Sequence, residues 1–118
     1  MPNKIQNSDQ NNTIENLKNR VAQFCEKRNW DKEHKPKELA IGAVTEASEL
    51  LEIFRFLSEE ECFKATINPK TRQKISEELA DTLCFLLRFA QLYHFDLTSC
   101  LKDKLAKNAI KYPSAEVP

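Results

Sequence analysis

The stretch PKELAIGAVTEASELLEIFRFL, residues 36–57, decides the fold class of this chain. Its apolar residues recur every three or four positions, so they share one face of a helix. This apolar stripe consists of Leu39, Ala40, Ala43, Val44, Ala47, Leu50, Leu51 and Phe54. Pro36 suits the first turn, because the amide proton that proline lacks would have no helical partner there. The pattern predicts one long amphipathic helix from Pro36 to about Leu57.

Three further segments have the same helical periodicity. Thr13, Asn68 and Asp96 each precede one of them and are suitable N-caps, because their side chains accept hydrogen bonds from free amides of the first turn. Pro113 ends the last segment, since proline does not continue a helix. We therefore expect helices from Thr13 to near Trp30, from Asn68 to about Tyr93, and from Asp96 to Pro113.

The connection after the long helix also contains a helical signal. Ser58 and Glu61 have the spacing of a capping box, which predicts a short helical turn. No segment reads as a convincing strand, and four helices with apolar stripes predict an all-α four-helix bundle. We expect this domain to span residues 13–113, after a flexible lead-in at 1–12 and before a frayed tail at 114–118.

One segment predicts that the bundle is incomplete in a single chain. TLCFLLRFA, residues 82–90, is apolar around most of the helix circumference. A monomeric bundle of 118 residues would leave part of this surface in contact with water. We expect a second copy of the chain to cover it, so that the bundle is completed by oligomerisation.

The composition excludes several classes of function. The chain has one glycine, Gly42, whereas phosphate-binding loops of the P-loop and Rossmann kind need several. The 18 Lys and Arg residues balance 18 Asp and Glu residues, so no strong field attracts nucleic acid or an anionic membrane. No apolar run approaches the ~20 residues of a membrane span, and the polar N-terminal stretch does not resemble a signal peptide. The four cysteines form no C-x-x-C pair, which is typical of reduced thiols in a cytoplasmic protein.

Two acidic pairs on the expected helices suggest a chemical site. Glu46 and Glu49 lie three positions apart on the second helix, and Glu78 and Asp81 lie three apart on the third. Residues with this spacing project side by side, here from the edge of each apolar stripe. If the two edges face each other, four carboxylates converge in a partly buried site that cations or protons must neutralise.

The residue types narrow the choice of cation. All-oxygen ligation favours Mg²⁺, or Mn²⁺ as a substitute, over zinc, which prefers histidine or cysteine. A di-iron bundle needs Glu-x-x-His, and neither His34 nor His94 supplies it. Gly42 lies on the acidic face, where a glycine inside a helix suggests close approach by another group. The simpler alternative is that these acids are solvated surface charges.

Four motifs, taken in order, resemble those of the MazG-like all-α nucleotide pyrophosphohydrolases, particularly the dCTP pyrophosphatase branch. They are RNWDKEHKP at 28–36, Glu46-x-x-Glu49, EELAD at 77–81 and NAIKYP at 108–113. The resemblance implies Mg²⁺-dependent cleavage of a nucleoside triphosphate, with dCTP the first candidate, to the monophosphate and pyrophosphate for nucleotide-pool sanitation. It also implies a dimer or a tetramer made of two dimers, with the tetramer favoured.

The same resemblance implies roles for individual residues. The metal-binding and catalytic carboxylates would be Glu46, Glu49, Glu78 and Asp81. Trp30 matches an aromatic residue beside the base, Phe56 matches a second aromatic, and His34 matches a substrate-binding histidine. A polar cluster expected to hold phosphate and close the site consists of Lys104, Asn108, Lys111 and Tyr112.

Several alternatives stay open at this point. Trp30 and Phe56 also suit core or dimer packing, and Lys104 and Lys111 also suit the C-terminal end of a helix. Val21 and Phe85 stand where the dCTP branch more often has His and Tyr, which leaves the base preference open. The rival functions are a related all-α hydrolase of another pyrophosphate-containing nucleotide and a non-catalytic helical oligomerisation module.

Overall fold

A computed structural model describes residues 7–115, and within that range the chain is helical without a strand. The prediction of an all-α fold is therefore confirmed. The elements are η1 (Asp9–Asn11), α1 (Ile14–Glu26), α2 (Pro36–Phe54), α3 (Glu59–Ala65), α4 (Pro69–Tyr93) and α5 (Leu97–Lys111). Among these, no helix combines the length and the apolar character that crossing a membrane would require.

The predicted helix starts are confirmed by their capping hydrogen bonds. The Thr13 hydroxyl accepts from the Asn16 amide at 3.0 Å at the start of α1. Ser58 and Glu61 form both bonds of the capping box that begins α3. Asn68 caps α4 and Asp96 caps α5 in the same way.

Two helices end earlier than their apolar patterns suggest. The α1 helix ends at Glu26 rather than near Trp30, because Asn29 has a left-handed backbone with φ 57°. Such a residue interrupts a right-handed helix. The α2 helix ends at Phe54 rather than at about Leu57. The flexible lead-in and frayed tail stay predictions, and their parts at 1–6 and 116–118 lie outside the described residues.

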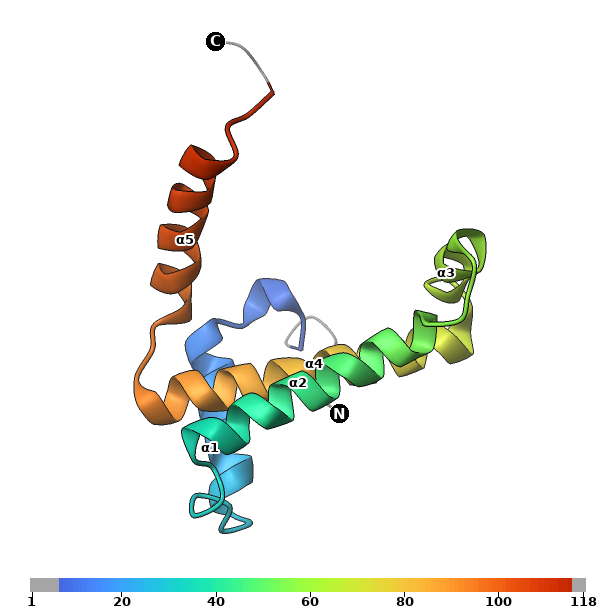
Figure 1. Cartoon of the computed structure of the whole chain (residues 1–118). Helices are drawn as coiled ribbons and strands as arrows, with labels where there is room; N and C mark the ends of the chain where they lie inside the picture. Colours follow the sequence, from blue (N-terminus) through green and yellow to red (C-terminus); the bar gives the residue numbers. More distant parts are fainter. Residues whose placement is uncertain (1–6, 116–118) are drawn as a thin grey trace.

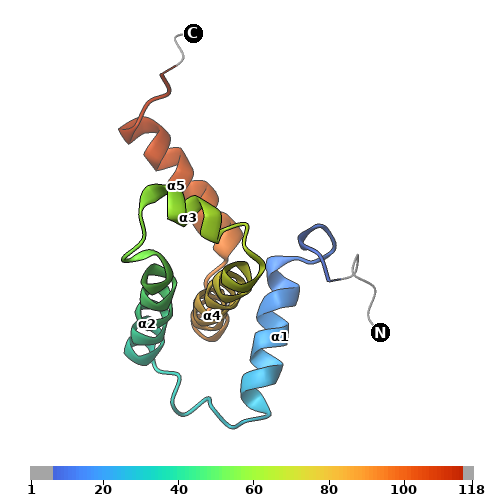
Figure 2. The same cartoon turned by 90° about the vertical axis from the view of Figure 1, so that its right-hand side faces the viewer.

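The long helix α4 lies between α1 and α2, as Figure 2 shows, and the pair α2 and α4 runs antiparallel along most of its length (Figure 1). These are also the helices that contact one another most extensively. The Nζ of Lys18 on α1 donates to the Phe95 carbonyl just after α4. The buried apolar residues are Ala22, Cys25, Leu39, Ala65, Leu87 and Ala90.

One chain does not form a closed bundle. The α5 helix rises away from the α2–α4 pair (Figure 1), and none of its residues is buried. The radius of gyration is 17.3 Å, compared with about 13.5 Å for a compact chain of this length. The exposed surface is 9972 Å², compared with roughly 6600 Å² for a compact monomer of this mass. Completion of the bundle by a second copy stays a prediction that fits this open shape.

Candidate metal and nucleotide site

Three of the four predicted carboxylates meet between α2 and α4. Glu46 and Glu49 project from α2 toward Glu78 on α4, and one oxygen from each lies within 4.8 Å of the others. Their spacing puts Glu46 and Glu49 on one face of α2. The antiparallel packing of α2 on α4 brings Glu78 opposite them. The expectation that the acidic edges of these two helices face each other describes these three residues correctly.

Gly42 explains how the two helices approach so closely. A Cβ atom at this position would overlap the ring of Phe85, which lies across the α2–α4 interface. The glycine is therefore required by helix packing one turn before Glu46. The close approach suggested by the sequence comes from the Phe85 ring.

The electrostatics of the cluster favour a bound cation. A hydrogen bond with Glu49, followed by burial and repulsion from the neighbouring carboxylates, raises the pKa of Glu78 to about 7. Burial, and then contact with Glu49, also raises the pKa of Glu46. Like charges at this separation disfavour ionisation of Glu46 and Glu78 unless a positive charge compensates them.

The donor set fits a hard divalent cation. Within residues 7–115, Oε2 of Glu46 and Oε2 of Glu78 are buried and have no hydrogen-bond partner. A buried oxygen without a partner is costly, and a cation would satisfy both atoms. Oxygen ligands alone suit Mg²⁺ or Mn²⁺, so Glu46, Glu49 and Glu78 are the residues that would hold such an ion.

Asp81 stands next to this cluster and outside it. Its carboxylate is near enough to raise the pKa of Glu46 and of Glu78 by repulsion, but it is not among the three whose oxygens converge. It lines a cleft of about 600 Å³ between α1 and α4. The other residues of this cleft are Arg20, Val21, Gln23, Phe24, Lys27, Arg28 and Cys84.

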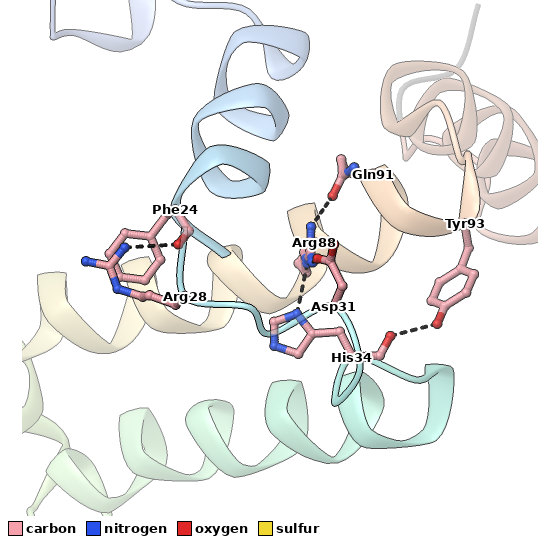
Figure 3. A network of polar contacts seen from close by, with 7 residues as sticks. All are labelled: Phe24, Arg28, Asp31, His34, Arg88, Gln91 and Tyr93. Carbon is pink, nitrogen blue, oxygen red and sulfur yellow. Dashed lines mark hydrogen bonds and ion pairs between the residues drawn. The ribbon is translucent and has the colours of Figure 1, made fainter. Parts of the chain in front are cut away.

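The loop between α1 and α2 carries Trp30 and His34 at the same end of the molecule as the start of α2. Trp30 is 42% exposed, and its ring packs edge-to-face with those of Phe24 and His34, whose centroids are 5.7 and 6.0 Å away. Figure 3 shows His34 turned toward Arg88 on α4. The sequence analysis did not identify Arg88 or Asp31 as residues of the site. The available signal was that Arg88 is a charged residue inside the apolar run at 82–90, and such a residue is buried only when it is paired.

Comparison with known proteins identifies the family of this chain. Residues 41–117 match the MazG-like family. The chain belongs to the MazG-like family. A solved structure of a pyrophosphatase from Archaeoglobus fulgidus DSM 4304 is 35% identical, with a TM-score of 0.79 over 86% of this chain and 93% of that one. The resemblance identified from the four motifs is therefore confirmed.

Curated relatives of this MazG-like chain are named for the nucleotide dCTP. The protein dCTP pyrophosphatase 1 from Rattus norvegicus is 34% identical over 101 residues, and that from Homo sapiens is 30% identical over 102 residues. Each alignment covers 86% of this chain. The chain spans about 59% of the length of the rat relative and 60% of the human one.

The remaining residues predicted from the MazG-like resemblance do not form one cluster within one chain. Trp30 and Phe56 lie beyond opposite ends of α2, a helix of 19 residues that is therefore about 28 Å long. A base cannot stack between these two rings of one protomer. Phe56 is 82% exposed beside Arg55. The predicted C-terminal cluster lies along or directly after α5, away from the α2–α4 pair: Lys104, Asn108, Lys111 and Tyr112.

Proposed function

We propose that this MazG-like protein is a Mg²⁺-dependent nucleoside triphosphate pyrophosphohydrolase, with dCTP as its first candidate substrate and nucleotide-pool sanitation as its role. The observation that carries the proposal is the group of three carboxylates with two buried, unpartnered oxygens. An oligomerisation module has no need for such an arrangement, because repulsion among converging carboxylates and buried oxygens without partners both destabilise the fold. The similarity to proteins named dCTP pyrophosphatase 1 supports the choice of substrate.

In this proposal, Glu46, Glu49 and Glu78 hold the metal and Asp81 is the fourth carboxylate of the site. A magnesium ion held by these carboxylates would supply positive charge that neutralises the triphosphate and polarises the reacting phosphorus. A carboxylate that is not fully engaged by the metal accepts a proton from the attacking water. Water adds to the α-phosphorus, the bond to the bridging oxygen breaks, and pyrophosphate leaves.

The cleft between α1 and α4 is the proposed place for the nucleotide. Asp81 lines this cleft and its charge acts on Glu46 and Glu78. Arg20, Lys27 and Arg28 supply positive charge along the wall of the cleft. Its volume of about 600 Å³ is within the range of known ligand sites. Trp30 and His34 would contact the base from the neighbouring loop, because a partly exposed indole suits stacking and an imidazole suits hydrogen bonding.

We further propose that the working protein is a homo-oligomer, with a tetramer favoured over a dimer. In an oligomer, Phe56 of one copy can lie near Trp30 of another, and the α5 cluster of one copy can approach the carboxylates of another, since α5 extends away from the α2–α4 pair of its own chain (Figure 1). The proposed location in the cytoplasm rests on the cysteine pattern, because all four cysteines are free thiols.

Pyrophosphate release from a panel of dNTPs, with and without Mg²⁺, tests the proposed function. We expect Glu46→Gln, Glu49→Gln and Glu78→Gln each to lower kcat/KM by at least about 100-fold, because loss of a metal ligand costs more than loss of its supporting residues. Glu52→Gln is the matched control on α2, since Glu52 lies in an exposed ion pair with Arg55.

Two results would contradict this proposal. Turnover that persists without a divalent cation would exclude the metal site as its origin. Failure of Mg²⁺ or Mn²⁺ to raise the melting temperature would exclude binding to the native state, since an ion that binds only the folded protein stabilises it.

A further inference from the structure

Arg88 is a buried charge that the carboxylate chemistry does not use. Its side chain is 2% exposed on α4. Each of its three guanidinium nitrogens has a different acceptor (Figure 3). Nε donates to Nδ1 of His34 at 2.9 Å, Nη1 donates to Oε1 of Gln91 at 2.7 Å, and Nη2 forms an ion pair with Asp31.

Two of these acceptors belong to the loop between α1 and α2. Asp31 and His34 lie on either side of the loop's turn, so one guanidinium holds both ends of the segment 31–34 against α4. A second tether comes from the hydroxyl of Tyr93, which donates to the His34 carbonyl at 2.7 Å. Trp30 directly precedes the anchored segment and contacts the His34 ring. The position of the indole therefore depends on the residues that fix His34.

The bond from Arg88 also determines the protonation of His34. A guanidinium nitrogen donates and never accepts, so Nδ1 of His34 must be the acceptor. The proton of the neutral imidazole then lies on Nε2, which is a hydrogen-bond donor. Burial, and then the positive charge of Arg88, lower the pKa of His34 and keep this neutral form.

We propose that Arg88 is a positioning residue that prefolds the loop 30–34, so that the Trp30 ring and the Nε2–H group of His34 stand ready for the base of a nucleotide. This inference rests on the proposed function, because it takes the base to be the ligand of this loop. Arg88 is buried and touches no substrate. Its effect is to remove the cost of ordering the loop when the nucleotide binds. It therefore acts on KM, whereas the carboxylates act on kcat.

Three variants test this role. Arg88→Gln removes the charge, Arg88→Lys keeps it without the planar fork that reaches three acceptors, and Asp31→Asn weakens the ion pair from the loop side. The Asp31 side chain is 59% exposed, so Asp31→Asn carries the test if Arg88→Gln does not fold. Arg72→Gln is the matched control on α4, because exposed Arg72 makes its hydrogen bond to the Thr66 carbonyl, away from the loop.

Trp30 is the chain's one tryptophan and reports the loop directly. In nucleotide-free protein we expect Arg88→Gln and Asp31→Asn to make its fluorescence more accessible to acrylamide, with circular dichroism unchanged. We expect KM for dCTP to rise on the order of 10-fold while kcat stays within about 2-fold, since preorganisation acts on binding. Arg88→Lys should be intermediate. ¹⁵N NMR should show neutral His34 protonated on Nε2 in the wild type and a higher His34 pKa in Arg88→Gln, because the positive charge of Arg88 is then absent.

Several outcomes would overturn the inference. One is that Asp31→Asn and Arg88→Gln show the same acrylamide quenching and the same KM as the wild-type protein. Another is a loss of kcat with no change in KM, which would indicate a role in the chemistry or in general folding. Absence of pyrophosphate release from the wild type would instead contradict the proposed function, and the fluorescence and NMR measurements would still decide whether Arg88 fixes the loop.

Discussion

Glu78 has a pKa well above that of an ordinary glutamate when no metal is bound. Its pKa is raised from 4.5 to about 7, first by the hydrogen bond with Glu49 and then by burial. An acid with a higher pKa in the folded state binds its proton more tightly there. Its contribution to stability is therefore complete at pH values below 4.5 and is lost as the pH rises through about 7.

We accordingly predict that the metal-free protein loses stability as the pH rises from about 5 to about 8. Glu78→Gln should flatten this part of the profile, because glutamine does not ionise. Thermal unfolding in the presence of a chelator, with both proteins in the same buffers, measures the difference. Parallel profiles for the two proteins would show that Glu78 does not titrate in this range.

At the scale of elements, the contact between Gly42 and Phe85 sets how closely α2 approaches α4. Replacing the glycine by alanine favours the helix by about 1 kcal/mol, but the new methyl group overlaps the Phe85 ring. Overpacking of this kind costs typically 1–3 kcal/mol. The two effects oppose each other, and the steric effect is expected to prevail.

We predict that Gly42→Ala lowers the free energy of unfolding by roughly 1–2 kcal/mol. In a Phe85→Leu background, the same substitution should become neutral or stabilising, because the ring that it meets is absent. Urea unfolding of the four proteins of this double-mutant cycle gives the coupling energy. Additive effects would show that the two residues do not contact each other.

At the scale of the whole molecule, the exposed apolar surface on α4 and α5 predicts self-association. Leu83 and Leu86 on α4 line an apolar hollow of about 300 Å³ that continues to Leu97 and Cys100 on α5. Leu101, one turn after Leu97 on α5, is 61% exposed. Apolar surface of this extent is typical of an interface and not of a monomer.

We predict that Leu83→Lys and Leu101→Lys each weaken self-association by at least about 100-fold, because burying a lysine in place of a leucine costs roughly 3 kcal/mol or more. Light scattering across a dilution series measures the mass of the assembly. Lys70→Glu, an exposed change at the other end of α4, is the control. A wild-type protein that stays monomeric at all concentrations would contradict the prediction.

Helix starts and the facing of the acidic edges were predictable from the sequence for identifiable reasons. Asn68 and Asp96 cap helices through bonds to amides two or three residues away, so their effect is contained in the local sequence. Glu46 and Glu78 border apolar stripes, and stripes pack on each other. Asp81 differs because spacing alone leaves its distance from the other acids undetermined.

Other residues of the site were not predictable in this way. Arg88 pairs with residues 54 and 57 positions earlier in the chain, and only the packing of the α1–α2 loop on α4 brings them together. Phe56 and Trp30 are separated by the length of α2. Only the positions of both helix ends in space show that the two rings of one chain cannot enclose one base.

Local interactions therefore determined which segments of this protein are helical and where each helix begins, because caps and apolar periodicity act over one or two turns. Packing determined the rest: which carboxylates meet, which side chain fills the space over Gly42, and what neutralises Arg88. These outcomes join residues that are far apart in the chain. They depend on how closely rigid helices can approach each other, and no periodicity within a single helix encodes that distance.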